Sequence, residues 1–351
     1  MKKEPVILVI NTGSTTTKMA VFKGEEILFE EKITHNVDEL QALSGFEQQV
    51  DYRKNIIEKV LKNRQIDVEK MDLIMCRGGL IKPVESGVYQ VNKKMLEDLR
   101  YAPKQHASNL AAVIGYRLSK HSNVYIADPV VVDEMHDIAR YAGHKLFQRI
   151  SIFHALNHKA VARKFAAEKR KKYENLNLIV AHMGGGISVG AHKKGKVIDV
   201  NQALDGEGAF SPERSGTLPA GDLVKMAFSE KYSLQEMREM IVGKGGLVSY
   251  TGSNNLQELE KNATPEIKEI LEAMAYQVAK QIGEMASVLQ GNVDAIILTG
   301  GVAHSPFITR LITERITFIA PVYIYAGEDE MQALAYNGNL IWKKELTPKD
   351  Y

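Results

Sequence analysis

Two stretches of the chain, VILVINTGSTTTKMAVFKGEEI at residues 6–27 and NLIVAHMGGGISVGAHKKGKVI at residues 177–198, align with each other without a gap. Each stretch contains an apolar run, a turn of small residues, a second apolar run, a Lys-Gly turn and a third run. This order predicts three antiparallel strands joined by two tight turns, and the chain contains it twice. Because the first turn of each copy is suited to surrounding a phosphate, the repeat predicts two related lobes that handle a nucleotide.

The composition narrows the class of protein. With 351 residues, the chain is long enough for two domains with substantial cores. Its net charge of +2 gives no reason to expect nucleic acid or an anionic membrane as a partner. Cys76 is the only cysteine, which excludes an intrachain disulfide and an all-cysteine metal site. No apolar run approaches the ~20 residues of a membrane span and no signal peptide is recognised, so we expect a cytoplasmic protein.

Hydrophobic periodicity outlines the rest of the chain. We expect helices over residues 46–63, 104–120, 154–173, 221–229, 233–242, 265–289, 305–314 and 327–343. We expect further strands over 72–75, 124–126, 294–298 and 321–325, and an irregular glycine-rich stretch over 205–221. A mixed sheet flanked by helices, occurring twice, predicts an α/β architecture with a cleft between two lobes.

The first turn of the first copy, Asn11–Lys18, is dense in hydroxyl groups and small residues. Its backbone N–H groups and the side chains of Ser14 and Thr16 can surround phosphate oxygens, and Lys18 can add a positive charge. From these residues alone, an ordinary polar turn is an equally good interpretation. The turn is not a Walker A loop, because the GxxxxGK[ST] spacing is absent and a strand follows it.

Two glycine-rich turns follow later in the chain. His182 ends a strand and precedes Gly184, Gly185 and Gly186, whose lack of side chains allows a ligand to approach the backbone closely. A buried strand also runs into Gly300 and Gly301, followed by His304, and we expect an adenosine site there. A glycine-rich turn alone is weak evidence, but the alignment of the first two turns strengthens the prediction of a nucleotide site.

The chain resembles the actin-like, sugar-kinase and heat-shock-70 ATPases, and within them the acetate and butyrate kinases. The resemblance covers essentially the whole chain through INTGSTTTK, CRGG, QHASN, DPVVVDEM, FHALNHK, HMGGGIS, RSGTLP, LTGGVAHS and GEDEMQAL, in that order. The wording of CRGG, DPVVVDEM and HMGGGIS is more similar to the butyrate branch. The resemblance implies two duplicated ribonuclease H-like domains with a nucleotide cleft between them. We place the first at 1–150, completed by 327–351, and the second at 151–326.

The resemblance also implies the chemistry, which is transfer of the γ-phosphoryl group of ATP to a carboxylate. Two anions must meet in this reaction, so cations are required. Arg77 ends a short strand and Arg214 lies in a glycine-rich loop, and a guanidinium grips a carboxylate or phosphate through two parallel hydrogen bonds. An arbitrary arginine is usually a surface residue. The resemblance assigns both arginines to the active site.

Histidines are the next candidates. The resemblance assigns His154 and His182 to the transferring phosphoryl group, whereas without it each would be read as a core histidine. His106 is expected on the substrate side, and Phe153, beside His154, is expected to line the substrate. His158 is expected to be structural or exposed. His154 and His158 are not interpreted as a zinc pair, because no third ligand accompanies them.

Acidic residues complete the predicted site. Asp128 follows an apolar run and precedes a proline, and we expect it to orient the attacking carboxylate. That substrate is ionised near neutral pH, so it needs no general base. Mg²⁺ is expected with the nucleotide, held by Asn11 and Glu330 directly or through water, with Glu328 as the alternative to Glu330.

The predicted activity is a short-chain carboxylate kinase, and three alternatives remain open. Gly79 stands where acetate kinases generally have a larger side chain, which is expected to leave room for butyrate, isobutyrate or a similar acid. An acetate or propionate kinase is the nearest alternative. An ATP-driven chaperone or filament subunit would not need an acyl substrate, and a sugar kinase would not need paired arginines. The family is generally oligomeric, so we also expect a homo-oligomer.

Overall fold

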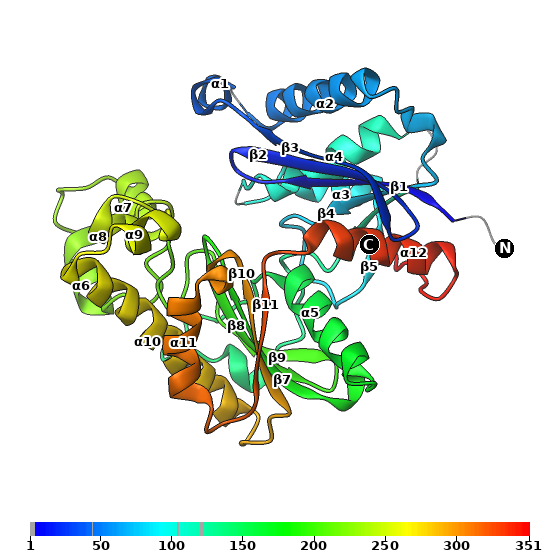
Figure 1. Cartoon of the computed structure of the whole chain (residues 1–351). Helices are drawn as coiled ribbons and strands as arrows, with labels where there is room; N and C mark the ends of the chain where they lie inside the picture. Colours follow the sequence, from blue (N-terminus) through cyan, green and yellow to red (C-terminus); the bar gives the residue numbers. More distant parts are fainter. Residues whose placement is uncertain (1–3, 44, 104, 120–122) are drawn as a thin grey trace. The chain divides into compact units, whose positions relative to one another are not determined.

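The computed structural model describes residues 4–43, 45–103, 105–119 and 123–351 (Figure 1). The chain divides into two compact units. Unit 1 comprises the residues up to Val132 together with Asp329–Tyr351, and unit 2 comprises Asp133–Glu328. The division therefore falls at 132/133, whereas the sequence analysis placed it after residue 150. Residues 133–150 group with unit 2 because Glu134 pairs with Lys159 at 2.6 Å and Arg149 pairs with Asp199 at 3.0 Å.

Unit 1 contains a six-stranded sheet in the order β3-β2-β1-β4-β6-β5. Its strands are β1 (Val6–Thr12), β2 (Thr16–Lys23), β3 (Glu26–Thr34), β4 (Leu73–Arg77), β5 (Val88–Gln90) and β6 (Val124–Ala127). The first three are antiparallel neighbours, while β4 runs parallel to β1 and β6 runs parallel to β4. The carboxyl ends of β1, β4 and β6 therefore lie side by side at one edge of the sheet.

Helices cover both faces of this sheet. They are α1 (Val37–Ala42), α2 (Phe46–Asn63), α3 (Lys93–Arg100), α4 (Ser108–Leu118) and α12 (Glu330–Trp342). Helix α4 packs on the face of Ile74 and Cys76 through Gly115, and α12 packs on the face of Ile7 and Met75 through Gly338. Residues 104 and 120, at the ends of the helix expected over 104–120, lie outside the described residues.

Unit 2 contains a five-stranded sheet in the order β11-β10-β7-β8-β9. Its strands are β7 (Asn177–Met183), β8 (Ile187–Lys193), β9 (Lys196–Val200), β10 (Ala295–Gly300) and β11 (Val322–Ala326). Its helices are α5 (Ala155–Glu168), α6 (Ala220–Ala227), α7 (Leu234–Ile241), α8 (Leu247–Thr251), α9 (Leu256–Lys261), α10 (Pro265–Val288) and α11 (Pro306–Ile316). Helices α10 and α11 pack on the face of Ile179 and Ile296, and α5 packs on the face of Leu178 and Ile297.

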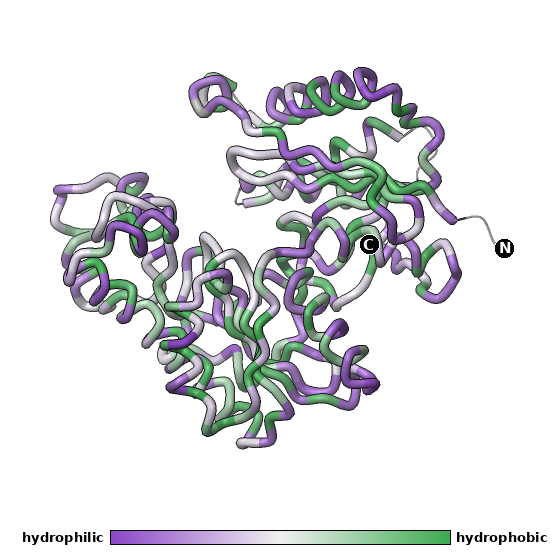
Figure 2. The backbone as a smooth tube through the Cα atoms, viewed as in Figure 1, coloured by the Kyte–Doolittle hydropathy of each residue, from purple (hydrophilic) through white to green (hydrophobic). Residues whose placement is uncertain are grey.

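The two units repeat one sheet design. Reading from β3 and from β9, both sheets have three antiparallel strands followed by two parallel strands in the same order and direction. The Lys-Gly turns also correspond, since Gly24 and Gly195 have φ of +59° and +86°, where glycine is favoured. Apolar residues follow the strands of both sheets in Figure 2. The predicted duplicated α/β fold is thereby confirmed.

Several short elements were not expected from periodicity. They are α1, α3, α8, α9 and β5, each of eight residues or fewer. Elements this short have too few turns or alternations to give a clear periodic signal, and tertiary packing decides them. Within the described ranges, no helix combines the length and the apolar character that crossing a membrane requires.

Candidate active site

The candidate site in unit 1 lies at the carboxyl ends of its parallel strands. Asn11 lies near the end of β1, Arg77 is the last residue of β4, and Asp128 follows directly after β6. Because these three strands are neighbours, the sheet brings the three predicted side chains to one edge. Ligands in open α/β sheets commonly bind at such an edge.

Asn11, Arg77 and Glu330 form a polar cluster at this edge. Nδ2 of Asn11 donates to Oε2 of Glu330 at 2.5 Å, and Nη1 of Arg77 donates to Oδ1 of Asn11 at 3.3 Å. The Arg77 guanidinium also lies 3.6 Å from Oε2 of Glu330. Glu330 is only 5% exposed and begins α12, where the positive end of the helix dipole favours a carboxylate. Residues far apart in sequence thus present one cation and one anion together.

The structure separates Glu330 from Glu328, the two acids between which the sequence could not choose. Glu330 belongs to unit 1 and contacts Asn11, whereas Glu328 ends unit 2. There, Oε1 of Glu328 lies 3.4 Å from Nε2 of His182. Of these two acids, only Glu330 therefore contacts Asn11, the other predicted magnesium ligand.

Asn11 and Glu330 suit a magnesium ion that is also held by a nucleotide. Among the described residues, no group of three or more His, Cys, Asp or Glu side chains is arranged to hold a metal. One amide oxygen and one carboxylate are nevertheless the kind of incomplete oxygen set that Mg²⁺ accepts when phosphates and water fill the remaining positions. The donor set is therefore compatible with Mg²⁺ bound to ATP.

Arg53 fixes the hairpin between β1 and β2 through hydrogen bonds from the interior of the unit. The sequence analysis did not single out this residue. Arg53 is 1% exposed, and its guanidinium donates to the carbonyl oxygens of Ser14 and Thr16, each at 2.8 Å. It also donates to Oγ1 of Thr17 at 3.0 Å. Within the described residues, no carboxylate forms an ion pair with it. Ser14 is exposed, and Thr16 and Lys18 are half-buried.

Replacing Arg53 by methionine is expected to raise the KM for MgATP about 10-fold, the effect of ~1.4 kcal/mol. Methionine keeps the apolar stem but leaves two turn carbonyls without their donor, so the hairpin loses its fixed conformation. Steady-state kinetics with each substrate varied in turn measure this effect. The KM for the carboxylate is the internal control, and an equal rise in both KM values would contradict the assignment.

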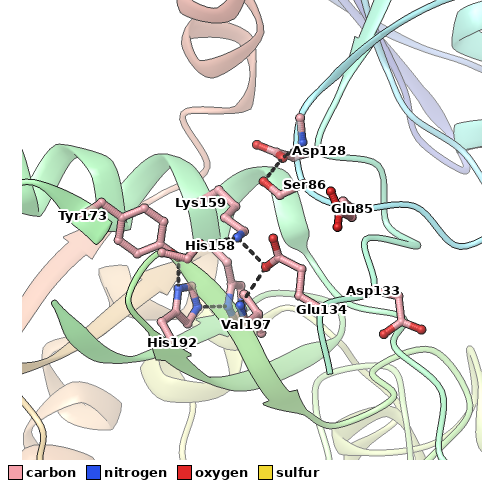
Figure 3. Close-up of polar contacts among 12 residues, drawn as sticks. Glu85, Ser86, Asp128, Asp133, Glu134, His158, Lys159, Tyr173, His192 and Val197 are labelled. Carbon is pink, nitrogen blue, oxygen red and sulfur yellow. Dashed lines mark hydrogen bonds and ion pairs between the residues drawn. The ribbon is translucent and has the colours of Figure 1, made fainter. Parts of the chain in front are cut away.

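Asp128 has the backbone strain that often accompanies function. Its φ is +38°, a conformation that non-glycine residues rarely adopt. Its Oδ1 accepts a hydrogen bond from Oγ of Ser86 at 2.6 Å (Figure 3) and another from the Gly87 amide at 2.9 Å. The carboxylate is therefore held in one orientation at the end of β6, in agreement with an orienting role.

The predicted substrate side of unit 1 needs one correction. A Cβ at residue 79 would lie 2.6 Å from Oδ1 of Asn109 and 2.8 Å from Cδ2 of Leu99. The space expected beside Gly79 is thus already filled, and the idea that this glycine makes room for a longer acyl chain is wrong. His106 lies next to the site, because Oγ1 of Thr12 donates to the Ala107 carbonyl at 2.6 Å. Its Nδ1 contacts Oγ of Ser108 at 2.8 Å.

The candidate site in unit 2 lies at the corresponding strand ends. His182 on β7 pairs in register with Thr299 on β10, and Gly300 exchanges two backbone hydrogen bonds of 3.0 Å with Gly327. Gly300 has φ +89°, and a Cβ there would overlap the Met183 backbone, so only glycine fits. Gly301 has open space around it, and the exposed His304 faces Gly327. This edge is compatible with the predicted adenosine contact.

The glycine turn after His182 accommodates Arg214. A Cβ at Gly186 would overlap Nη1 of Arg214 and lie 2.6 Å from its Cζ, so the guanidinium lies directly against this glycine. The carbonyl of Gly185 accepts from Oγ of Ser211 at 2.5 Å and from the Glu213 amide at 3.3 Å. These bonds fix the loop that carries Arg214, whose Nη1 also donates to the Ala203 carbonyl. Gly184 closes the turn onto the Gly186 carbonyl at 2.9 Å.

The rings of His154 and His182, which the sequence analysis assigned to the same phosphoryl group, stack on each other. Their ring centroids are 3.8 Å apart with an interplanar angle of 16°. Nδ1 of His182 contacts Oδ1 of Asn157 at 2.9 Å, which fixes the ring and leaves Nε2 on the other side. Phe153 is 2% exposed and packs edge-on against His158. Its ring therefore supports His158, which is fully buried.

We expect the stability of the protein to fall as the pH decreases below about 6.5, because several histidines are buried as neutral rings. Burial, and then the charge of Arg53, lowers the pKa of His35 to about 4. Burial also lowers the pKa of His158 and of His192 well below the usual value. The unfolded chain then binds more protons, so each histidine lowers stability by up to ~1.4 kcal/mol per pH unit.

Urea unfolding midpoints between pH 7.5 and pH 4.5 measure this dependence. His35→Gln keeps a hydrogen-bonding group near Thr17 but cannot be protonated, so its midpoint should fall less steeply than that of the unmodified protein. His144→Gln, at an exposed position, is the matched control. Identical slopes for the unmodified protein and His35→Gln would exclude this contribution.

Comparison with known proteins defines the class. Residues 137–321 match the sequence profile of the Acetokinase family. The chain belongs to this family. It is 52% identical to Butyrate kinase 2 of Clostridium acetobutylicum over 94% of each chain. It is 49% identical to Butyrate kinase 1 of the same organism, over 98% of this chain and 99% of the relative.

Solved structures agree with the fold. An acetate kinase from Porphyromonas gingivalis superimposes with a TM-score of 0.77 and 18% identity, over 96% of this chain and all of the other. A propionate kinase from Francisella tularensis superimposes with a TM-score of 0.75 and 19% identity, over 95% and 98%. The chain therefore has the two-domain actin-like ATPase fold of these kinases.

Proposed function

We propose that this protein catalyses reversible phosphoryl transfer between ATP and a short-chain carboxylate, giving ADP and an acyl phosphate. Butyrate, isobutyrate or a similar acid of three to five carbons is the proposed acceptor. The observation that carries the proposal is the Arg77 guanidinium beside Asn11 and Glu330, in a chain about half identical to two butyrate kinases. The preference for butyrate rests on these relatives, since Gly79 does not open space for the acyl chain.

The reaction joins one carboxylate oxygen to the γ-phosphorus, while the bond from that phosphorus to the bridging oxygen of ADP breaks and its electron pair stays on ADP. The attacking carboxylate is ionised at neutral pH, so no proton has to be removed. Catalysis then depends on positioning and on stabilising charge on the phosphoryl oxygens.

We assign the residues of unit 1 to the acceptor and to the metal-bound phosphates. Arg77 grips an anion through its fork of N–H groups, and Asp128 orients the groups at the neighbouring strand end. The hairpin from Asn11 to Lys18 contacts phosphate oxygens. Asn11 and Glu330 would hold Mg²⁺, which when bound neutralises charge on the nucleotide phosphates.

We assign the residues of unit 2 to the transferring group and the nucleoside. His182 and His154 donate hydrogen bonds to the phosphoryl oxygens, and Arg214 neutralises their charge. The amides of Gly184–Gly186 approach the phosphates, and Gly300, Gly301 and His304 contact the adenosine. We also propose a cytoplasmic homo-oligomer, in line with the sequence analysis.

Trapping the acyl phosphate as a hydroxamate tests the proposed function. Purified protein is incubated with MgATP, hydroxylamine and one acid from a series of two to five carbons, and hydroxamate and ADP are both measured. The expected result is acid-dependent ADP release, with the highest kcat/KM for butyrate or isobutyrate. A maximum for acetate would support the acetate-kinase alternative. ADP release without an acid would indicate an ATPase of another class.

A further inference from the structure

A continuous chain of hydrogen-bonding side chains runs from His154 into the interior of unit 2. Nδ1 of His154 lies 2.9 Å from Oγ of Ser188, which lies 2.9 Å from Nε2 of His158. Nδ1 of His158 lies 3.1 Å from Nε2 of His192, and Nδ1 of His192 lies 2.6 Å from the hydroxyl of Tyr173. Figure 3 shows the inner part of the chain, from His158 to Tyr173. The sequence analysis assigned no function to His158, His192 or Tyr173.

Helix α5 and strand β8 position the side chains of this hydrogen-bond chain. His154 occupies the N-cap position of α5 and His158 lies one turn later, so both side chains share a helix face. Ser188 and His192 lie on one face of β8, with Gly190 between them. A Cβ at Gly190 would lie 3.4 Å from two atoms of the His158 ring, so the ring packs directly on this part of the strand. The chain is therefore a built feature of the α5–β8 contact.

All inner members of the chain are buried. Ser188, His158 and His192 are 0% exposed, and Tyr173 is 5% exposed. Burial lowers the pKa of both inner histidines, and the nearby charges of Lys159, Arg163 and His182 act in the same direction. Lys159 is itself paired with Glu134 at 2.6 Å and lies 5.6 Å from the centre of the Tyr173 ring. The two inner rings are therefore neutral.

Counting hydrogens leaves only two arrangements for the chain. A neutral imidazole has one N–H, and each inner histidine is contacted at both nitrogens, so each must donate at one and accept at the other. The Ser188 hydroxyl is fully buried and, within the described residues, contacts only these two rings, so it donates its one hydrogen to one ring and accepts from the other. All four hydrogen bonds must therefore point in the same direction, either away from Tyr173 or toward it.

The direction of the chain sets the tautomer of His154. If Tyr173 donates, Ser188 donates to Nδ1 of His154, and the proton of that ring stays on Nε2. If Tyr173 accepts, His154 carries its proton on Nδ1, and its Nε2 cannot donate to a phosphoryl oxygen. At 2.6 Å, Tyr173 and His192 are within hydrogen-bond distance, and a neutral imidazole nitrogen is a good acceptor for a phenol. A phenol is also a better donor than a neutral imidazole N–H.

We propose that Tyr173, His192, His158 and Ser188 are positioning residues that keep the proton of His154 on Nε2 through a directional hydrogen-bond chain. This inference rests on the proposed function, because a donor at Nε2 matters only if His154 faces the phosphoryl group. The chain fixes the ring by its Nδ1 side, in the way that an outer partner commonly selects a histidine tautomer. Neighbouring bonds in such a chain strengthen one another, so the far end influences the near end.

Long-range ¹H–¹⁵N spectra of protein labelled in histidine ring nitrogens test the inference directly. His154→Gln identifies the signals of His154, and the expected result is a ring protonated on Nε2. In Ser188→Ala, the His154 signals should move to a mixture of tautomers, whereas Ser188→Thr should retain the Nε2–H form. A His154 ring protonated on Nδ1 in the unmodified protein would overturn the proposal, whatever the activity.

Kinetics provide the second readout. Ser188→Ala and Tyr173→Phe should lower kcat roughly 3-fold to 10-fold, with the KM for MgATP changed less than 2-fold. Tyr351→Phe is the matched control, since that hydroxyl donates to Asp98 at the same distance of 2.6 Å in unit 1. A kcat for Tyr173→Phe equal to that of Tyr351→Phe would contradict a role for the far end of the chain. If the His154 tautomer is as proposed but no acyl phosphate forms, the proposed function is wrong, while the proposed role of the hydrogen-bond chain is retained.

Discussion

Replacing Arg77 by alanine is expected to lower kcat/KM for acyl phosphate formation by about 10³-fold, as loss of an arginine that stabilises transferred phosphoryl charge commonly does. The side chain is 20% exposed and lies at the end of β4, where its guanidinium contacts Asn11 and Glu330. No other arginine of the described residues takes part in this cluster. Rates with butyrate and MgATP, measured with each substrate varied, determine the loss.

Two further variants separate catalysis from stability at this position. Arg77→Ala leaves Glu330 without its nearest cation, so a lower thermal midpoint is also expected. Combining it with Glu330→Gln removes that buried charge and should recover stability but not activity. Arg64→Ala, which breaks an exposed pair with Glu31 in the same unit, is the control and should keep the full rate. If Arg77→Ala retains more than a tenth of kcat/KM, Arg77 does not contact the reacting groups.

The fold could be predicted because its signals are local and are repeated. The apolar runs of residues 6–27 and 177–198 specify strands, and the turns between them contain glycine where φ is positive, as at Gly24 and Gly195. The positions of Asn11 and Arg77 near strand ends could be predicted as well, whereas their roles remain predictions. Since parallel strands end at one edge, naming the strands was sufficient to bring these residues together.

The remaining parts of the site depend on packing between distant elements. Arg53 lies in the middle of α2, and no local pattern indicates that it turns inward to the hairpin carbonyls. The hydrogen-bond chain behind His154 requires the facing of α5 and β8, which a sequence does not specify. Gly79 illustrates the converse error, because the absence of a side chain suggested space that Asn109 and Leu99 occupy. A weak hint existed for His158, which follows His154 by one helical turn.

The two copies of the repeat differ in the side chains of their first turn. The first copy has Asn11, hydroxyl groups and Lys18, and it lies beside Glu330 in unit 1. The second copy has His182 in place of Asn11, and Gly185 and Gly186 in place of Ser14 and Thr15. Those glycines allow the Arg214 guanidinium to lie directly on the turn, which a side chain at residue 186 would prevent. Gly186 therefore makes room for Arg214, in addition to the nucleotide contact proposed for this turn.

This relation leads to a prediction for two single variants and their combination. Arg214→Ala should lower kcat about 10²-fold to 10³-fold through loss of a charge-stabilising donor. Gly186→Ala should lower kcat about 10-fold to 100-fold, because the added methyl group displaces the guanidinium and small misplacements in a site are costly. Gly186 has no positive φ, so the backbone accepts alanine. The atoms that the added methyl group would displace are at the end of the flexible Arg214 side chain. The urea unfolding midpoint of Gly186→Ala should therefore change little.

The combined variant distinguishes displacement of Arg214 from independent damage to the turn. If Gly186→Ala acts through Arg214, the double variant should be no slower than Arg214→Ala alone, since both changes remove one interaction. Multiplied losses in the double variant would show that the methyl group blocks the nucleotide itself. Gly283→Ala is the control, since its Cβ meets no atom within 4 Å and lies within α10. It should raise stability by about 1 kcal/mol and leave kcat unchanged, because alanine is a better helix former than glycine.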